Sequence, residues 1–572
     1  MFTGVVYTIL VIFIHAWASA LLVLTGWAMR RPPNMGRVTG KIPTLLLLCN
    51  HFLLFICFGN SNVNIKRMRK LITSLALLFS ICYIVNAQVY DLNIDGVVIK
   101  NFDVFKKGQN IHLISMTHDQ YYSDNGKVTD TYKLETNQGK VFVTEKLGSV
   151  FDLNYSDAQS FWDSQIVFNV LEQLSKKGAQ SEIRGEMEDE ALEYINRVYS
   201  SGLAFNDPFL ETYLYGIISK LAPSVLIDGR PGNINLVIER NPTANASMYP
   251  NGTLVINTGL LSILHSEDEL AAILAHEIAH FVLDHSVQNF NKSISRQKRA
   301  EFWASFATAL TAAAETAIAE KDPYYVPGVA TIAVATISTS IAAELCERLG
   351  MKYSRAQETE ADEAAVQLLK VLKYDTNALS TALSRIEETM RQERSIQMYF
   401  ASDHPALIDR IKKYGTPSEN VNRDFEKIIS FAVSDAAIMK MQNKRFRQVL
   451  PLVSQNINNM VATADDYILK AYCLLYLKND IGSSDEIMNL LTEAKELDPN
   501  NINIYKAEIL AYLRKNNYSN ALSLLKDYKN KLGAIINAEN NLPDDSWSNL
   551  YDYAMKENNW AGEMLIKLRS FK

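Results

Sequence analysis

The chain has 572 residues, of which 48% are hydrophobic and 21% are charged, which is the balance of a globular protein with about three to four domains. Its net charge is −6 and it contains no long basic run, so the sequence excludes the electrostatic footprint of a nucleic-acid-binding protein. The five cysteines form no CxxC pair, which argues against both a disulfide framework and a thiolate metal site.

The N-terminal region is strongly apolar, and its assignment leaves two interpretations open. From Met68, basic residues, an apolar run and small to medium residues before Gln88 have the layout of a signal peptide over residues 68–87. The extension 1–67 is then either a mis-assigned start or a set of genuine membrane spans. We favour the first, because a complete signal peptide starting inside the chain is otherwise hard to explain. Both interpretations predict export to the periplasm or envelope, with a membrane anchor under the second.

Residues 88–160 are predicted to form a small β-rich domain. Short runs of Val, Ile, Tyr, Phe and Thr are separated there by turn signals such as "NIDG", "SDNGK" and "TNQGK". The stretch "YKLETNQGKVFVTE" has nearly alternating strands around a Gly-containing loop, which predicts a β-hairpin. We expect a small barrel of the SH3-like kind.

Residues 161–425 are predicted to form a second domain, in which helical periodicity is interrupted by two strands. The strands are "INLVIER" at 234–240 and "GTLVINTG" at 252–259, and a helix capped by Ser266 follows them. Residues 302–345 are rich in alanine and predict a helical hairpin. This hairpin is either buried in the fold or in contact with a membrane beside the active site.

Residues 426–572 are predicted to form tetratricopeptide-like helical repeats. "KAYCLLYLKN" at 470 and "KAEILAYLRK" at 506 match at an offset of 36 residues, close to the period of about 34 of that repeat. "ELDPNN" supplies a proline between helix pairs. Stacked helix pairs of this kind form an α-solenoid with a concave face. A plain helical bundle is the alternative, because the Trp and Gly of the repeat consensus are missing.

The second domain contains an HExxH motif at His276, Glu277 and His280. Residues four apart project from the same side of a helix, so both imidazoles can bind one zinc ion. Glu277 flanks that face, where it can accept a proton from a water molecule activated by the metal, as a general base does. His285 lies about 140° around the helix from His280, so we expect it on the surface or in a second layer and not among the ligands.

A catalytic zinc site needs a third protein ligand and an open position. The best candidates lie in "SRAQETEADEAAVQLL", where Glu358 and Asp362 are one helical turn apart on one face and Glu360 points the other way. One carboxylate could bind zinc while the other orients a ligand imidazole. Taken alone, such an acidic face is more often simply solvated.

These motifs, in this order, resemble the metallopeptidase family of HtpX, the CAAX prenyl proteases and BepA. "NASMYPNGTLVINTGLL" (245–261) resembles the family's edge-strand segment before the zinc helix, "SRAQETEAD" its third-ligand helix, and "HPALIDRI" (404–411) its HPxxxxRI element. The resemblance covers roughly residues 180–425. The exported start and the repeat-like tail are most similar to BepA-like periplasmic proteases, whereas residues 88–155 are not part of that pattern.

The resemblance implies a zinc site of the gluzincin type, which is HExxH plus a distal glutamate. It implies Glu358 as the third ligand beside the two histidines, and Asp362 as the carboxylate that supports the ligands. His404 is implied either to stabilise the oxyanion or to bind zinc in a resting state. Arg410 is implied to form a structural ion pair.

The implied fold is multidomain, with a mainly α-helical zincin (gluzincin) peptidase domain and its small β-sheet between the β-rich domain and the α-solenoid. The implied function is a zinc-dependent endopeptidase with one Zn²⁺ per chain, acting on extended or misfolded proteins in envelope quality control. The repeats would select envelope assembly partners. A substrate would add by backbone hydrogen bonds to an edge strand made of Thr253, Leu254, Val255, Ile256 and Asn257.

Two other functions stay open. The first is a non-hydrolytic periplasmic chaperone or assembly scaffold that acts through its helical repeats, although the intact HExxH and ExxxD motifs argue against a dead site. The second is an integral-membrane protease, which requires that the apolar extension 1–67 contains genuine spans.

Overall fold

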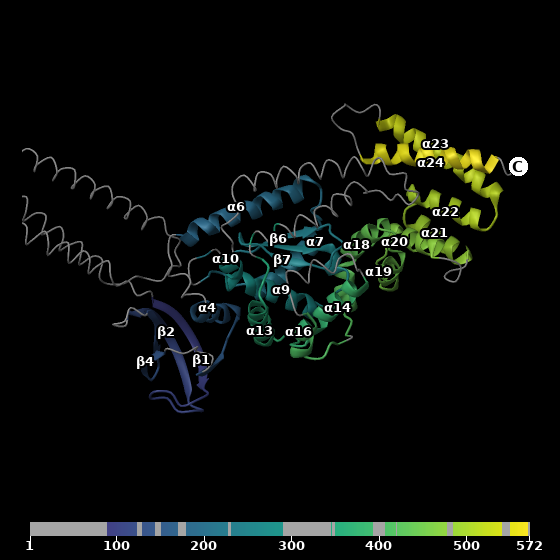
Figure 1. Cartoon of the computed structure of the whole chain (residues 1–572). Helices are drawn as coiled ribbons and strands as arrows, with labels where there is room; N and C mark the ends of the chain where they lie inside the picture. Colours follow the sequence, from purple (N-terminus) through teal and green to yellow (C-terminus); the bar gives the residue numbers. More distant parts are fainter. Residues whose placement is uncertain are drawn as a thin grey trace, which may run out of the picture. The chain divides into compact units, whose positions relative to one another are not determined.

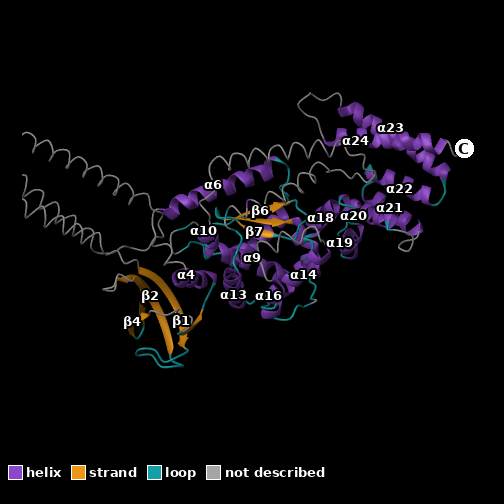
Figure 2. Cartoon of the chain, in the orientation of Figure 1, coloured by secondary structure: helices purple, strands orange, loops and turns teal. Residues whose placement is uncertain are grey.

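The computed structural model of the chain describes residues 89–569, except for 123–127, 144–149, 170–178, 227–229, 231, 290–344, 346–348, 350, 393–406, 419, 478–483 and 540–548. The apolar extension, the predicted signal peptide, the predicted helical hairpin apart from Leu345, and His404 lie outside the described residues. Most of the described chain is helical, and its strands form two sheets (Figure 1, Figure 2). None of the described helices has both the length and the apolar composition that crossing a bilayer requires.

The β-rich segment forms a five-stranded antiparallel sheet with the order β4-β3-β2-β1-β5. Alternate residues of β1 are buried from Tyr90 to Val98, so one face covers a core that includes Ile94, Leu113 and Phe151. The predicted hairpin is confirmed as β3 and β4. Among the described strands β4 and β5 are the two edges, and the predicted closure into a small barrel of the SH3-like kind stays a prediction. The strands are β1 (Val89–Val98), β2 (Asn110–Tyr122), β3 (Val128–Thr136), β4 (Gly139–Val143) and β5 (Phe151–Asn154).

The second sheet has three strands in the order β6-β8-β7, with β8 parallel to β6 and antiparallel to β7. The prediction that residues 253–257 form an edge strand is therefore wrong, because they make up the central strand β8. All five of its residues are buried, which is typical of a strand covered on both faces. The two edges are β6 and β7, and β7 is a three-residue strand that the sequence pattern did not reveal. The strands are β6 (Asn235–Glu239), β7 (Ala246–Met248) and β8 (Thr253–Asn257).

Helix α9 (Glu267–Val282) is the central element beside this sheet (Figure 1). As predicted, Ser266 caps it, since its hydroxyl accepts a hydrogen bond from the amide of Glu269 at 3.2 Å. The helix packs against α7, α13, α14 and β7, and every residue from 270 to 280 is buried. The surrounding helices are α4 (Ala158–Asn169), α6 (Ala179–Ser200), α7 (Pro208–Leu221), α8 (Thr258–Leu261), α10 (His285–Asn289), α13 (Arg355–Leu372), α14 (Ala378–Gln392) and α16 (Leu407–Lys413).

A run of helices follows, in which each helix packs against the next. The matching sequence stretches at 470 and 506 fall in α20 and α22, two helices apart, while their tetratricopeptide-like character stays a prediction. The buried apolar cluster around α9 continues without a break into these helices, through Phe425, Val433 and Leu469. The helices are α17 (Arg423–Ile428), α18 (Ser430–Gln442), α19 (Phe446–Asn458), α20 (Ala464–Tyr476), α21 (Ser484–Leu497), α22 (Asn503–Arg514), α23 (Tyr518–Glu539) and α24 (Asn549–Arg569).

Helices α8 and α18 meet closely where the C-terminal helices join the rest of the fold. The hydroxyl of Thr258 donates a hydrogen bond to Asp435 at 3.1 Å, and the Arg240 guanidinium lies 3.4 Å from the same carboxylate. The neighbouring Gly259 lies against the backbone of Pro242, and a β-carbon on it would be 2.3 Å from that carbonyl group. The short α8 therefore has room for a glycine alone at this position.

We expect Gly259→Ala to lower the free energy of unfolding by about 1–3 kcal/mol or more, because the added methyl group overlaps the Pro242 carbonyl. Gly216→Ala is the matched control, since nothing lies within 4 Å of the corresponding position on the exposed side of α7. That change should stabilise the protein by about 0.5–1 kcal/mol, the usual gain for alanine inside a helix. Urea denaturation measures both, and equal effects would contradict the packing described for α8.

Asp435 should make stability depend on pH. Burial raises the pKa of this carboxyl from 3.8 to about 6, against the lowering effects of Arg240 and Thr258. The folded state therefore holds a proton that the unfolded state loses first, so the stabilisation is complete below about pH 4 and is lost as the pH rises to about 6. The total change is on the order of 3 kcal/mol.

In Asp435→Asn this contribution disappears, so the variant should gain stability relative to the wild type between about pH 4 and about pH 6. Denaturation at several pH values measures this difference. A difference that is the same at every pH would show that Asp435 does not titrate in this range.

Candidate metal centre

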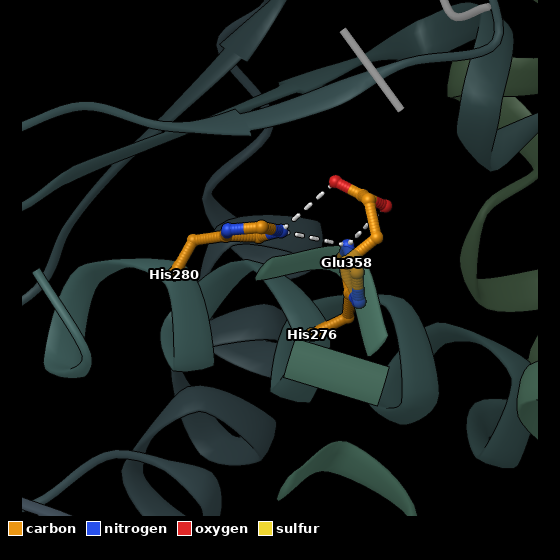
Figure 3. Close-up of side chains that lie close together, drawn as sticks. All are labelled: His276, His280 and Glu358. Atoms are coloured by element: carbon orange, nitrogen blue, oxygen red, sulfur yellow. Dashed lines mark hydrogen bonds and ion pairs between the residues drawn. The ribbon is translucent and has the colours of Figure 1, made fainter. Parts of the chain in front are cut away.

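Helices α9 and α13 bring together three of the predicted site residues. His276 Nε2 lies 3.1 Å from His280 Nε2, and the two carboxylate oxygens of Glu358 lie 3.7 Å and 3.4 Å from these nitrogens. All three side chains are buried, and they form a group able to hold a metal ion. Figure 3 shows both ring nitrogens and the carboxylate directed toward one another.

The local sequence sets the position of Glu358 at the start of α13. Ser354 caps this helix in a reciprocal arrangement, in which its hydroxyl accepts from the amide of Gln357 while the Gln357 side chain accepts from the amide of Ser354. Such a capping box fixes where the helix begins and therefore which way its first turn faces. Glu358 is the next residue, and it points toward α9.

His276 is held from behind by a buried ion-pair network. Its Nδ1 lies 2.9 Å from Asp362, which also accepts two hydrogen bonds of 2.8 Å from Arg410. Arg410 further lies 2.5 Å from Glu358. Burial alone would raise the pKa of Asp362, but the hydrogen bond and charge of His276 and the charge of Arg410 outweigh it, so this pKa is lowered. Arg410 thus pairs with both acidic residues that the sequence placed on one helix face.

His280 has a different partner behind it. Its Nδ1 lies 2.8 Å from Nδ1 of His285, and the ring of Tyr353 stacks on it with the ring centres 3.6 Å apart. His285 is fully buried. Of the two predicted positions, the second layer is therefore confirmed and the surface is excluded. Burial, the largest influence, lowers the pKa of His280 well below its ordinary value, so its ring stays neutral and can offer a lone pair. No sequence motif pointed to Tyr353.

The three converging groups fit a zinc ion. The contact with the Asp362 carboxylate places a proton on Nδ1 of His276. If Nδ1 of His280 also carries its proton, both Nε2 atoms present lone pairs to each other at 3.1 Å and to a carboxylate. A cation between these three groups would offset the repulsion between their lone pairs and the negative charge of the carboxylate. Ligands bound to a tetrahedral zinc ion at about 2.0–2.1 Å are about 3.3 Å apart. The separations of 3.1, 3.4 and 3.7 Å lie close to that value.

Glu277 lies between the helix and the edge of the sheet. Its carboxylate accepts a hydrogen bond of 3.1 Å from the amide of Met248 in β7. Tyr249 and Asn245, on either side, bond to β8 instead, so the backbone groups of Ala246 and Met248 face away from β8. The outer edge of β7, which pairs with none of the described strands, therefore runs beside the helix that carries the HExxH motif.

At the end of α9, an acid occupies a position where helix dipoles usually favour a basic residue. Asp284 is buried there in a left-handed backbone conformation with φ of 63°. Arg184 bonds it at 2.7 Å, while Arg230 lies 3.5 Å from it and donates to the carbonyl groups of Phe281 and Val282. The positive charge at the helix end thus comes from other segments of the chain.

We expect Arg410→Met to lower the free energy of unfolding of the metal-free protein by about 3–5 kcal/mol, because it leaves two buried carboxylates without their cation. Lys413→Met is the matched control. The Lys413–Glu363 pair joins the same two helices at 2.8 Å, but its side chains are 47% and 54% exposed. Its loss should cost less than about 1 kcal/mol. Chemical denaturation measures both, and equal losses would contradict the importance of the buried network.

Comparison with known proteins shows what this arrangement is similar to. Residues 208–417 match the model of the family described as "Peptidase family M48". The matched segment begins with α7, ends after α16 and contains His276, His280 and Glu358. It therefore includes every helix that contributes to the candidate metal centre.

Three curated relatives are metalloproteases or proteases by name. The chain is 30% identical over 179 residues to the mitochondrial metalloendopeptidase OMA1 of Schizosaccharomyces pombe, which is 31% of this chain and 44% of that protein. It is 24% identical over 314 residues to the putative beta-barrel assembly-enhancing protease of Vibrio cholerae, which is 54% of this chain and 60% of that protein. It is 30% identical over 155 residues to the metalloprotease YcaL of Escherichia coli, which is 27% of this chain and 50% of that protein.

The alignments thus span about half the length of these relatives. They agree with the family match and with the resemblance carried by the HExxH, ExxxD and HPxxxxRI motifs. We conclude that this chain carries a peptidase family M48 domain over residues 208–417.

Proposed function

We propose that this protein is a zinc-dependent endopeptidase. The observation that carries the proposal is the buried convergence of two imidazoles and one carboxylate beside a second carboxylate, that of Glu277. Two histidines and a glutamate are a ligand set of catalytic zinc sites that leave one position open. The names of the relatives support hydrolysis of peptide bonds as the reaction.

In this proposal His276, His280 and Glu358 hold the zinc ion. When bound, zinc supplies a Lewis acid that lowers the pKa of water and polarises the scissile carbonyl group. Glu277 accepts the proton from the attacking water and delivers it to the leaving amine. The hydrogen bond from the Met248 amide positions the Glu277 carboxylate for this transfer. His404, which lies outside the described residues, stays a proposed oxyanion partner or resting-state ligand.

The proposed substrate is an extended segment of polypeptide. It would add to the outer edge of β7, which no other described strand occupies and where the backbone groups of Ala246 and the carbonyl group of Met248 face away from β8. Backbone pairing of this kind tolerates many sequences, so it suits unfolded or misassembled proteins. This replaces the predicted role of β8, whose two sides are already paired.

The proposed setting is quality control in the cell envelope. One relative is named a putative beta-barrel assembly-enhancing protease, and the signal-peptide layout of residues 68–87 supports export. The C-terminal helices would select assembly partners. The rival proposal, a non-hydrolytic chaperone or scaffold, rests on these helices alone. Sequencing the N-terminus of the mature protein tests export, and we expect it to begin at Gln88.

We expect the Glu277→Gln variant to keep its zinc. Its rate of cleavage of an unfolded protein should be lower than that of the wild type by a factor of about 100 or more. The glutamine oxygen can still accept from the Met248 amide, so the fold should be unchanged. Glu363→Gln is the control, since this residue is exposed on α13. Zinc content and cleavage are measured in the wild type and both variants.

The outcomes separate the two proposals. Equal cleavage by Glu277→Gln and the wild type would rule out the general-base role. A wild type that binds zinc, suppresses aggregation and cleaves nothing, with Glu277→Gln doing the same, would favour the scaffold.

A further inference from the structure

We infer that His285 is a positioning residue that accepts the Nδ1 proton of His280 and thereby directs the Nε2 lone pair of His280 toward the metal. The inference rests on the proposed zinc site. It assigns a purpose to the third histidine of the "HEIAHFVLDH" stretch, which lies outside the group of three candidate ligands. It also assigns a purpose to Glu360, the acid of α13 that points away from the ligands.

The position of the proton on the His280 ring follows from its two contacts. A neutral imidazole carries one proton, on either Nδ1 or Nε2. Nε2 faces His276 and Glu358, so it can bind a metal only if the proton is on Nδ1. Nδ1 lies 2.8 Å from Nδ1 of His285, a full hydrogen-bond contact between two buried rings. His280 must donate in this contact, so Nδ1 of His285 must accept.

Glu360 favours one tautomer of His285. If Nδ1 of His285 accepts, the proton of His285 is on Nε2. That nitrogen lies 3.4 Å from a carboxylate oxygen of Glu360, whose side chain is 40% exposed. A carboxylate can only accept at this contact, so it favours the tautomer of His285 that the bond from His280 requires. The chain of hydrogen bonds therefore has one direction, from His280 through His285 to Glu360.

Tyr353 fixes the orientation of the His280 ring. Tyr353 stacks on His280 with an angle of 14° between the ring planes, and its hydroxyl lies 3.1 Å from the Ser286 hydroxyl, next to His285. Tyr353 therefore limits rotation of His280, while His285 supplies the acceptor. If His285 served only to fill space, any flat side chain of similar size would replace it.

The two ligand histidines thus have unlike supports. His276 faces the charged Asp362–Arg410 pair, whereas His280 faces a neutral imidazole. A neutral acceptor orients the ligand without adding a buried negative charge, which would need a second cation. Among the described residues that contact His285, Glu360 is the acidic one, and it is open to solvent.

The test compares His285→Asn with His285→Phe. An asparagine oxygen occupies nearly the position of the histidine Nδ1 and can accept from His280, whereas phenylalanine fills the space and accepts nothing. We expect zinc affinity, measured by competition with a chelator, to fall about 10–100-fold in His285→Phe and less than about threefold in His285→Asn. The visible absorption of the cobalt-substituted protein should shift in His285→Phe and stay close to the wild type in His285→Asn.

Glu360 provides a second test that does not disturb the core. Glu360→Gln keeps an acceptor for His285 and should leave zinc affinity within about twofold, while Glu360→Lys removes the acceptor and should weaken it about fivefold or more. Glu363→Lys makes the same charge change at an exposed site of the same helix and measures the purely electrostatic part. If His285→Phe does not fold, the zinc affinities of these variants test the role of the His280–His285–Glu360 contacts in its place.

Two results would overturn the inference. Equal zinc affinity in His285→Phe and His285→Asn, with a zinc-binding wild type, would show that acceptance by His285 has no role, and the proposed function would stand. A wild type that binds no zinc would overturn both the inference and the proposed function.

Discussion

The buried contact between α9 and α13 is the constraint on which the candidate site depends. It places two carboxylates, Glu358 and Asp362, against two imidazoles in a region where each is at most 4% exposed. Such a cluster of acids is costly to bury without compensation. Arg410, from a third helix, contacts both carboxylates and supplies that compensation. The site is therefore assembled from three helices, and none of them could form it alone.

The same packing links the site to the rest of the chain. Residues of α9 belong to one continuous apolar core with α7, α14 and the first C-terminal helices. The close contact of α8 with α18, at Gly259 and Asp435, joins these helices to the sheet that carries β7. A core of this extent restricts the movement of the site's side chains, and a metal centre requires such restricted placement.

The sequence predicts which side chains converge, because helical periodicity places His276 and His280 on one face and Glu358 one turn from Asp362. That these two faces meet came from the family resemblance, and the convergence is observed. The sequence predicts the wrong edge strand, because β7 is only three residues long, too short for its alternation to be recognised, and its pairing with β8 depends on a tight turn. It also could not distinguish a surface position from a buried one for His285. The burial of His285 depends on α10 packing beside Tyr353, and these two residues are 68 positions apart in the sequence.

We propose that this cluster holds zinc through two imidazoles and a carboxylate. X-ray absorption at the zinc edge of the purified protein reports the atoms bound to the metal. We expect one zinc per chain with nitrogen and oxygen neighbours at about 2.0–2.1 Å, with the scattering pattern of two imidazoles and no sulfur. A sulfur neighbour at about 2.3 Å, or a protein that retains no zinc, would contradict this proposal.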